Sequence, residues 1–136
     1  MTQAPPLTVL AFDFGLRNIG VATGQAITHT ASEIATVRAR DGVPDWNAVD
    51  ALVRQWRPDA LLVGLPLNMD DTESEMSTRA KRFAKKLRVR YHLTVNLVDE
   101  RLTSFEARGI SDDLDAQHAI AARLIAETYL RALQRD

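Results

Sequence analysis

The stretch LTVLAFDFGLRNIGVATG, residues 7–24, sets the expected fold, and a single acid, Asp13, ends its apolar run. Residues 7–14 are almost continuously apolar, which is typical of a strand buried on both faces at the centre of a sheet. Gly15 permits a tight turn and residues 18–25 resume as a second strand, so we expect a hairpin. An ionised carboxylate at the end of a buried strand costs desolvation unless it meets a cation or hydrogen-bond donors. Asp13 is therefore a candidate metal ligand, and the alternative is a turn or cap aspartate.

Length and composition limit the class of protein. The chain has 136 residues, which predicts one domain over residues 1–136. A hydrophobic fraction of 46% and a charged fraction of 26% exclude disordered and fibrous classes. No apolar run approaches transmembrane length, and the N-terminus lacks a basic region followed by an apolar core, so we expect a cytoplasmic protein without a membrane partner. The absence of cysteine excludes disulfides, thiolate zinc sites and cysteine nucleophiles.

The rest of the chain alternates helices and strands. We expect a third strand over residues 28–38 at the sheet edge, a turn at 41–44 and a helix over 46–56 capped by Asp45. A buried strand over 59–65 follows, and then a long helix that starts from a capping box of Thr72 and Glu75. The remaining elements are a strand over 93–98, a short helix from Thr103 to Gly109 and a last helix over about 112–133. A strand that follows a helix implies a parallel neighbour. The order predicts an α/β fold with a mixed sheet of about five strands and helices on both faces.

Two acids stand at the carboxyl ends of predicted strands, where ligands gather in open α/β sheets. Asp13 ends the first strand and Glu100 follows the strand over residues 93–98. On the last helix, His118 begins an inward stripe that continues through Ala122, Ile125, Tyr129 and Ala132 or Leu133, and Asp115 lies on the same side. Two carboxylates with an imidazole or a third carboxylate suit a hard divalent cation. The alternative for Glu100 is a surface ion pair with Arg101. The alternative for His118 is a hydrogen-bonded residue of the core.

The distribution of charge is uneven. A net charge of −1 argues, taken alone, against a nucleic-acid-binding protein. However, residues 79–90 carry a run of cations with no acid among them: Arg79, Lys81, Arg82, Lys85, Lys86, Arg88 and Arg90. Repulsion between these cations at helical spacing favours neutralisation by a polyanion, although a solvated helix face is the alternative. The loop over residues 68–72 either positions a substrate strand or caps the next helix.

Several motifs together carry a family resemblance that covers nearly the whole chain. They are Asp13-Phe14-Gly15 with Ile19-Gly20-Val21-Ala22, Val63-Gly64-Leu65-Pro66-Leu67-Asn68 with Asp70-x-Thr72-Glu73, Phe83-Ala84-x-x-Leu87, and Asp99-Glu100-Arg101-Leu102-Thr103 with Glu106-Ala107. This pattern resembles the YqgF family of pre-16S rRNA nucleases, which is similar to the RuvC Holliday-junction resolvases. The resemblance implies a ribonuclease H-like fold and a metal-dependent nuclease with Asp13 and Glu100 as two of its acids.

The chain departs from the family pattern at two places. Asp71 stands where the family usually has a glycine, and His118 stands where the family has its third acid. Some RuvC resolvases resemble this chain in using a histidine there. If the register of the last helix differs, Asp115, one turn earlier, takes the third position.

These observations lead to the hypothesis of a divalent-metal-dependent endonuclease acting in 5′-end processing of pre-16S rRNA. The expected metal ligands are Asp13, Glu100 and His118, with Mg²⁺ or Mn²⁺ as the ion and Mn²⁺ somewhat favoured by the softer imidazole. The expected nucleic-acid contacts are Arg79, Arg82, Lys85, Lys86, Arg101, Asn68 and Thr72.

Three alternatives stay open at this point. A resolvase of branched DNA would need paired active sites and hence a homodimer. A ribosome-assembly factor would bind RNA without cutting it. The segment from Asp13 to Gly20 also resembles a phosphate loop of actin-like ATPases, but the chain lacks the length for their two lobes.

Overall fold

A central mixed sheet carries helices on both faces, as predicted. The computed structural model describes residues 8–102 and 114–134. Its strands are β1 (Thr8–Asp13), β2 (Asn18–Gln25), β3 (Thr30–Arg40), β4 (Val43–Pro44), β5 (Ala60–Leu65) and β6 (Thr94–Asp99). Its helices are α1 (Trp46–Trp56), α2 (Glu75–Tyr91), the short 3₁₀ helix η1 (Glu100–Leu102) and α4 (Leu114–Gln134). The predicted short helix over residues 103–109 lies outside the described residues.

The strand order is β4-β3-β2-β1-β5-β6, so β1 is central and buried on both faces. Pairing is antiparallel from β4 to β1 and parallel from β1 through β5 to β6. The predicted count of five strands is wrong by one. Residues 43–44, expected to be part of a turn, form a two-residue edge strand, because Asp41 and Gly42 both have positive φ (48° and 82°) and close a tight hairpin.

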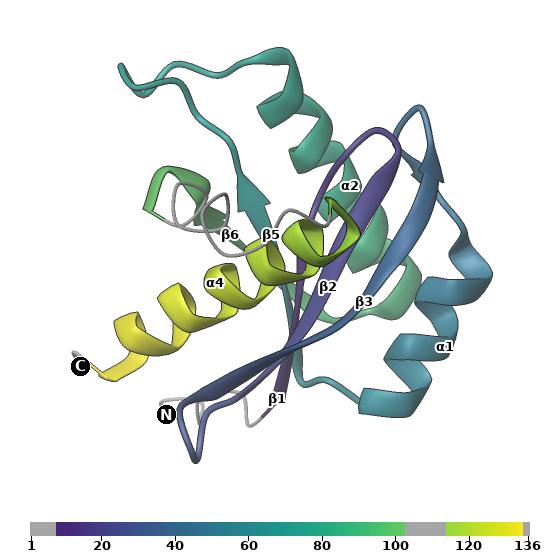
Figure 1. Ribbon diagram of the computed structural model, residues 1–136, viewed down its shortest axis with the longest axis vertical. Helices are drawn as coiled ribbons and strands as arrows, with labels where there is room; N and C mark the ends of the chain where they lie inside the picture. Colours follow the sequence, from purple (N-terminus) through teal and green to yellow (C-terminus); the bar gives the residue numbers. More distant parts are fainter. Residues whose placement is uncertain (1–7, 103–113, 135–136) are drawn as a thin grey trace.

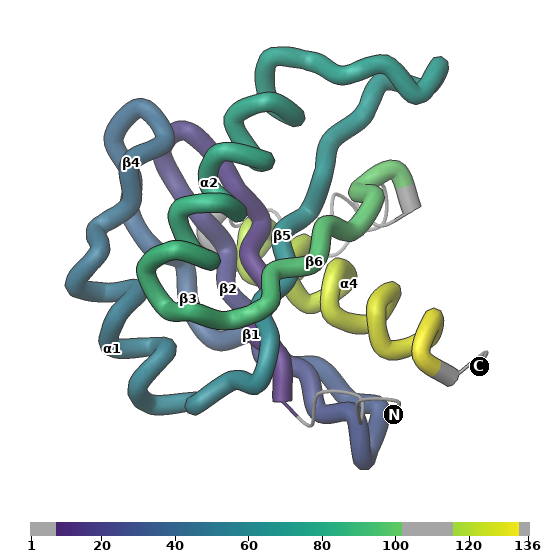
Figure 2. Tube along the Cα trace, turned by 180° about the vertical axis from the view of Figure 1, so that it is seen from behind, coloured from purple at the N-terminus to yellow at the C-terminus, as the bar shows by residue number. Residues whose placement is uncertain are grey.

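The alternation of β1 divides the core into two layers. Leu10 and Phe12 pack with α1 and α2, where Val49 and Phe83 are buried. Val9 and Ala11 pack on the opposite face against Ile125 and Ala126 of α4. Figure 1 views the sheet from the side that α4 crosses, and Figure 2 views it from the side that α1 and α2 cover. In the described residues, no helix is long and apolar enough to cross a membrane.

Helix α2 begins two residues later than predicted. Its N-cap is Ser74, whose hydroxyl accepts from the backbone N–H of Ser77, while the Ser77 hydroxyl accepts from the N–H of Ser74. Thr72 does not cap the helix, because its hydroxyl is used in the preceding loop, where it donates to Asp70 (2.6 Å). The predicted N-cap of α1 is confirmed, since Asp45 accepts from the backbone N–H of Asn47.

Candidate active site

The two acids predicted from strand ends come together at the carboxyl edge of the sheet. Asp13 is the last residue of β1, and Glu100 follows β6 as the first residue of η1. Strand β5 lies between these two strands, so the carboxylates meet across it. The two carboxyl groups are hydrogen-bonding partners, and this contact lowers the pKa of Asp13 and raises the pKa of Glu100.

The contact across β5 depends on a glycine that the sequence motifs contain but to which we assigned no role. A Cβ at Gly64 would lie 2.7 Å from Cγ of Glu100 and 2.6 Å from Cδ1 of Ile125. Gly64 therefore leaves the space into which the side chain of Glu100 folds. The available signal was a glycine inside the otherwise bulky apolar run of β5, which often marks a close approach by another group.

A second glycine positions the last helix over the site. Gly20 lies opposite Asp13 in the pairing of β1 with β2. A Cβ at Gly20 would overlap the backbone carbonyl of His118, so only glycine lets α4 approach β2 this closely. This approach places Nδ1 of His118 3.7 Å from Oδ2 of Asp13. The structure thus brings together Asp13, Glu100 and His118.

The predicted inward stripe of α4 is partly confirmed. Ala122 and Ile125 are fully buried, whereas the side chain of His118 keeps 33% of its exposure and Ala132 is exposed. A half-exposed imidazole beside a buried carboxylate differs from the hydrogen-bonded core histidine that was the alternative. Asp115 belongs to α4, but its side chain lies outside the described residues.

Burial dominates the electrostatics of the carboxyl pair. Desolvation raises the pKa of Asp13, and the hydrogen bond from Glu100 opposes this rise. The pKa of Glu100 is raised first by burial, then by its hydrogen bond to Asp13 and by the charges of Asp13 and Asp99. Two partly buried carboxyl groups in contact repel each other when both are ionised, and a cation would relieve this repulsion.

This donor set fits a divalent ion in part. Oxygen ligands from two carboxylates suit Mg²⁺ or Mn²⁺. A proton between the two carboxyl groups and a bound cation both reduce the repulsion between them, so the ion would take the place of the proton. Within residues 8–102 and 114–134, the side chains that the structure describes form no group of three His, Asp or Glu arranged as a complete metal site. Asp13 and Glu100 alone are two oxygen donors, and their role as metal ligands stays a prediction.

The proton shared by the pair predicts how stability depends on pH. In metal-free buffer, Glu100 keeps a proton in the folded chain, whereas the unfolded chain releases it above the ordinary pKa of 4.5. Folding then becomes less favourable as the pH rises above that value, by about 1.4 kcal/mol for each unit of pKa difference. Glu100→Gln removes this loss, so its Tm in EDTA should exceed that of the wild type by a margin that grows from pH 5 to pH 8. Parallel Tm curves for the two proteins would contradict the shared proton.

Arg101 braces a loop beside the site. Its guanidinium donates to Asp99 and to Asp71, each at 2.7 Å, and to the backbone carbonyl of Asn68 at 3.1 Å. The alternative for Glu100 was a surface ion pair with Arg101; Arg101 forms its ion pairs with Asp99 and Asp71. Arg101 thus has partners inside the chain, and its contact with nucleic acid stays a prediction.

The loop over residues 66–74 projects from the edge of the sheet between β5 and α2 (Figure 1). Asn68 donates to the hydroxyl of Thr72 at 2.9 Å, which closes the turn. Asp71, which stands at the usual glycine of the resembling family, has a φ of 70°. Aspartate tolerates this left-handed conformation better than most residues do, and its ion pair with Arg101 helps to hold it there. Asp71 therefore adopts a backbone conformation that glycine adopts without strain.

Three of the seven cations in residues 79–90 form ion pairs. This corrects the prediction that no acid neutralises the charge of these cations. Acids outside residues 79–90 pair with three of them: Asp41 and Glu75, the first residue of α2, with Arg79, Glu73 with Lys81, and Asp50 with Arg90. No ion pair within the described part of the chain involves the other four, which are Arg82, Lys85, Lys86 and Arg88. These four exposed cations remain available to a polyanion.

Comparison with known proteins decides the family. The sequence model of RuvX, described as Holliday junction resolvase, matches residues 7–132. The chain belongs to the RuvX family. A Marinobacter nauticus protein with the name "Putative pre-16S rRNA nuclease" is 54% identical over 132 residues, which cover 90% of this chain and 92% of that protein.

Solved structures similar to this RuvX chain share its fold at low sequence identity. Thermus thermophilus RuvC, solved with a Holliday junction substrate, has a TM-score of 0.57 at 15% identity and covers 93% of this chain and 96% of its own. The fowlpox virus Holliday junction resolvase has a TM-score of 0.54 at 15% identity, with coverages of 93% and 99%. The ribonuclease H-like fold predicted from the sequence is therefore confirmed.

Membership of the RuvX family also settles the class of reaction. The family and the related fold are those of nucleases, so the chain is a hydrolase that acts on phosphodiester bonds. Nucleases of this fold generally use divalent metal ions. The family therefore favours a nuclease over the two other classes considered above, an ATPase and an RNA-binding factor without nuclease activity.

Proposed function

We propose that this RuvX chain is a divalent-metal-dependent endonuclease that processes the 5′ end of pre-16S rRNA in the cytoplasm. The observation that carries the proposal is the pair of partly buried carboxyl groups, Asp13 and Glu100, which meet across Gly64 at the carboxyl edge of the sheet. The choice of RNA rests on the names of relatives that are about half identical to the chain over most of its length.

In this proposal each residue of the site has a role that its position supports. Asp13 would anchor the ion. Glu100, in its deprotonated form, would hold the ion and orient the attacking water. The bound divalent ion stabilises negative charge on the attacking and leaving oxygens. His118, 3.7 Å from Asp13, completes the ligand set or protonates the leaving oxygen. An imidazole ligand favours Mn²⁺ over Mg²⁺ somewhat.

The substrate is held outside the carboxyl pair. The four α2 cations without an ion pair among the described residues include Arg82, Lys85 and Lys86, which contact phosphates in this proposal. Asn68 and Thr72 close the loop, and Arg101, the neighbour of Glu100 in the chain, holds it through the carbonyl of Asn68. In this proposal the loop contacts the substrate strand near the scissile phosphodiester bond. Arg79 contributes less than predicted, because Asp41 and Glu75 already offset its charge.

A second candidate function is the cleavage of branched DNA. The description of the RuvX family and the fold of the two solved resolvases favour it. A four-way junction offers two strands for cutting, so this function requires a homodimer with two active sites.

One cleavage experiment tests the proposal and separates the two candidates. Purified protein with Mn²⁺ or Mg²⁺ is given a labelled RNA that spans the 5′ end of 16S rRNA and, separately, an immobile four-way DNA junction. We expect metal-dependent cleavage of the RNA. If only the junction is cleaved, and light scattering shows that the protein is a dimer, the chain is assigned as a resolvase of branched DNA. Cleavage of neither substrate would overturn the proposal.

Substitutions on α4 identify the third group of the site. His118→Asn should lower the cleavage rate at least about tenfold, the usual range for groups that support a metal site. His29→Asn makes the same change at an exposed residue in the turn after β2, at the opposite edge of the sheet, and should leave the rate unchanged. Inactivation by Asp115→Asn with an active His118→Asn would assign the third position to Asp115.

A further inference from the structure

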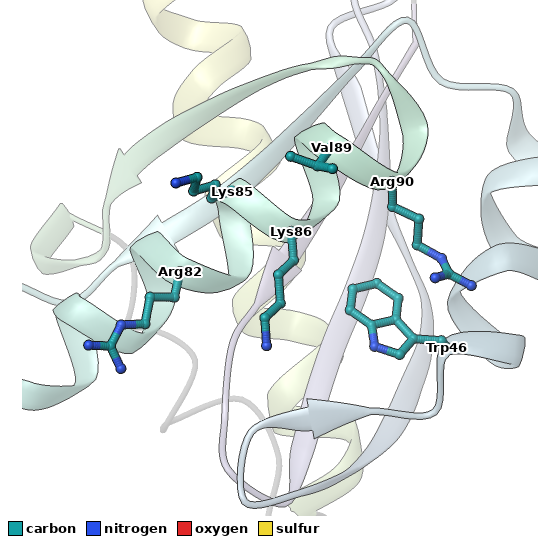
Figure 3. Close-up of a pocket in the computed structure, with 6 residues that line it drawn as sticks. All are labelled: Trp46, Arg82, Lys85, Lys86, Val89 and Arg90. Atoms are coloured by element: carbon teal, nitrogen blue, oxygen red, sulfur yellow. The ribbon is translucent and has the colours of Figure 1, made fainter.

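A groove runs along α2 on the face of the sheet opposite α4. It has a cavity volume of about 600 Å³, and its lining consists of Trp46, Arg82, Lys85, Lys86, Val89 and Arg90 (Figure 3). A smaller hollow of about 180 Å³ shares Arg82 and Lys86 with it and extends to Phe14. The two hollows therefore adjoin each other along α2, on the face of the sheet where Phe14 packs against Phe83.

The excess positive charge of this groove lies in its middle. Arg82, Lys85 and Lys86 are exposed and make no ion pair with any other described residue. At one end, Arg90 is held by two hydrogen bonds to Asp50, both at 2.8 Å. In the smaller hollow, the charge of Arg79 is offset by Asp41, which also lines that hollow.

An aromatic and apolar wall faces these cations. The ring of Trp46 is fixed by Phe83, whose centroid is 6.2 Å away in a stacked arrangement, and by the guanidinium of Arg90, 4.9 Å from its centroid. Val89 keeps 62% of its exposure at the rim of the groove. Figure 3 shows Lys86 extending toward the side of the groove on which Trp46 lies. An occupant that satisfies both walls needs an anionic part and a flat apolar part.

We infer that this groove binds a single-stranded segment of the nucleic-acid substrate, on the face of the sheet opposite α4. Phosphates of the segment contact Arg82, Lys85 and Lys86, and a base packs against Trp46 and Val89. Cation-lined grooves with aromatic side chains are the usual way to hold a strand without sequence preference. A duplex keeps its bases stacked inside and offers nothing to the apolar wall. This inference rests on the proposed function and adds the form of substrate that the enzyme prefers.

The fluorescence of Trp46 reports on the groove directly. The chain has two tryptophans, so Trp56→Phe leaves Trp46 as the only one. In this variant without metal, a 12-nucleotide single-stranded RNA should quench the emission in a saturable way, and a duplex of the same sequence should quench it far less. Three phosphate contacts predict that affinity falls about 20-fold between 50 and 200 mM salt.

Two matched substitutions in α2 test the location. Lys86→Glu, inside the groove, should weaken binding at least about tenfold, because it adds repulsion to the loss of a contact. Arg88→Glu makes the same change at an exposed residue that does not line the groove, and it should change the affinity less than about threefold. Both residues are exposed, so folding is expected to be intact in both variants.

Several outcomes would overturn the inference. They are the absence of quenching, equal binding of duplex and single strand, equal weakening by the two substitutions, and equal quenching by an oligoglutamate peptide. The readout does not depend on catalysis. If the groove variants bind like the wild type while cleavage is metal-dependent, the inference fails and the proposed function stands. If the single strand quenches Trp46 as expected while no RNA is cut, the proposed function fails and the groove stands as a binding site.

Discussion

Asp13→Asn should lower the cleavage rate by about 10³-fold or more while the protein folds as well as the wild type. Asparagine keeps the size of the side chain and can donate to Glu100, but it removes the negative charge that the site offers to a cation. Burial raises the pKa of Asp13, so the ionised carboxylate is a cost to the folded chain that the substitution relieves. The Tm of Asp13→Asn in EDTA should therefore equal or exceed that of the wild type. Single-turnover cleavage and thermal unfolding measure the two effects.

The control is the same substitution at the opposite edge of the sheet. Asp59 precedes β5 and accepts a hydrogen bond from the backbone N–H of Thr8 at 2.9 Å. Asp59→Asn should leave the cleavage rate within about twofold of the wild type and should not raise the Tm. Cleavage at the wild-type rate by Asp13→Asn would exclude this carboxylate from the chemistry.

The positions of Asp13 and Glu100 could be predicted because they follow from the pattern of single strands. Runs of apolar residues identified β1 and β5 as buried on both faces, and a helix between them required a parallel arrangement. Parallel strands end at the same edge of a sheet, so Asp13 at the end of β1 and Glu100 after β6, which pairs in parallel with β5, converge there. The sequence thus predicted both the sheet edge and the two carboxyl groups that meet at it.

The roles of Gly20 and Gly64 could not be predicted in the same way. Each glycine matters because of what packs against it, the backbone of α4 in one case and the side chain of Glu100 in the other. Such contacts join elements that are distant in the sequence, and no periodicity within one strand encodes them. A glycine in a strand signals a close approach but does not identify the group that approaches.

The same limitation explains the error in the charge of α2. Counting charges within residues 79–90 finds no acid, and i,i+4 repulsion follows from that count. Two of the acids that offset these cations, Asp41 and Asp50, come from the β3–β4 turn and from α1, which the fold brings alongside. Local charge patterns therefore overestimated repulsion, and only the folded arrangement shows which cations remain for a ligand.

Gly20→Ala should destabilise the protein by about 3 kcal/mol or more and disrupt the site at the same time. The new methyl group would overlap the carbonyl of His118 and crowd the backbone nitrogen of Ala119, which would lie only 2.8 Å from the added Cβ. Neither atom can rotate away, because both belong to the backbone of α4. The helix must move off β2, and His118 moves with it away from Asp13. We expect the Tm to fall by roughly 10 °C and the cleavage rate to fall with it at temperatures where the variant is folded.

Gly24→Ala is the matched control, on the same strand and under the same helix. Its methyl group would meet Cγ2 of Val9 at 2.9 Å and Cδ1 of Leu130 at 3.3 Å, which are ends of side chains that can shift. The Tm should therefore fall by less than half as much, and cleavage should persist because this position lies away from Asp13. Equal destabilisation by the two substitutions would mean that the close approach of α4 at His118 is not what requires glycine at position 20. The difference between the two variants isolates the contribution of backbone contact between β2 and α4 to the geometry of the site.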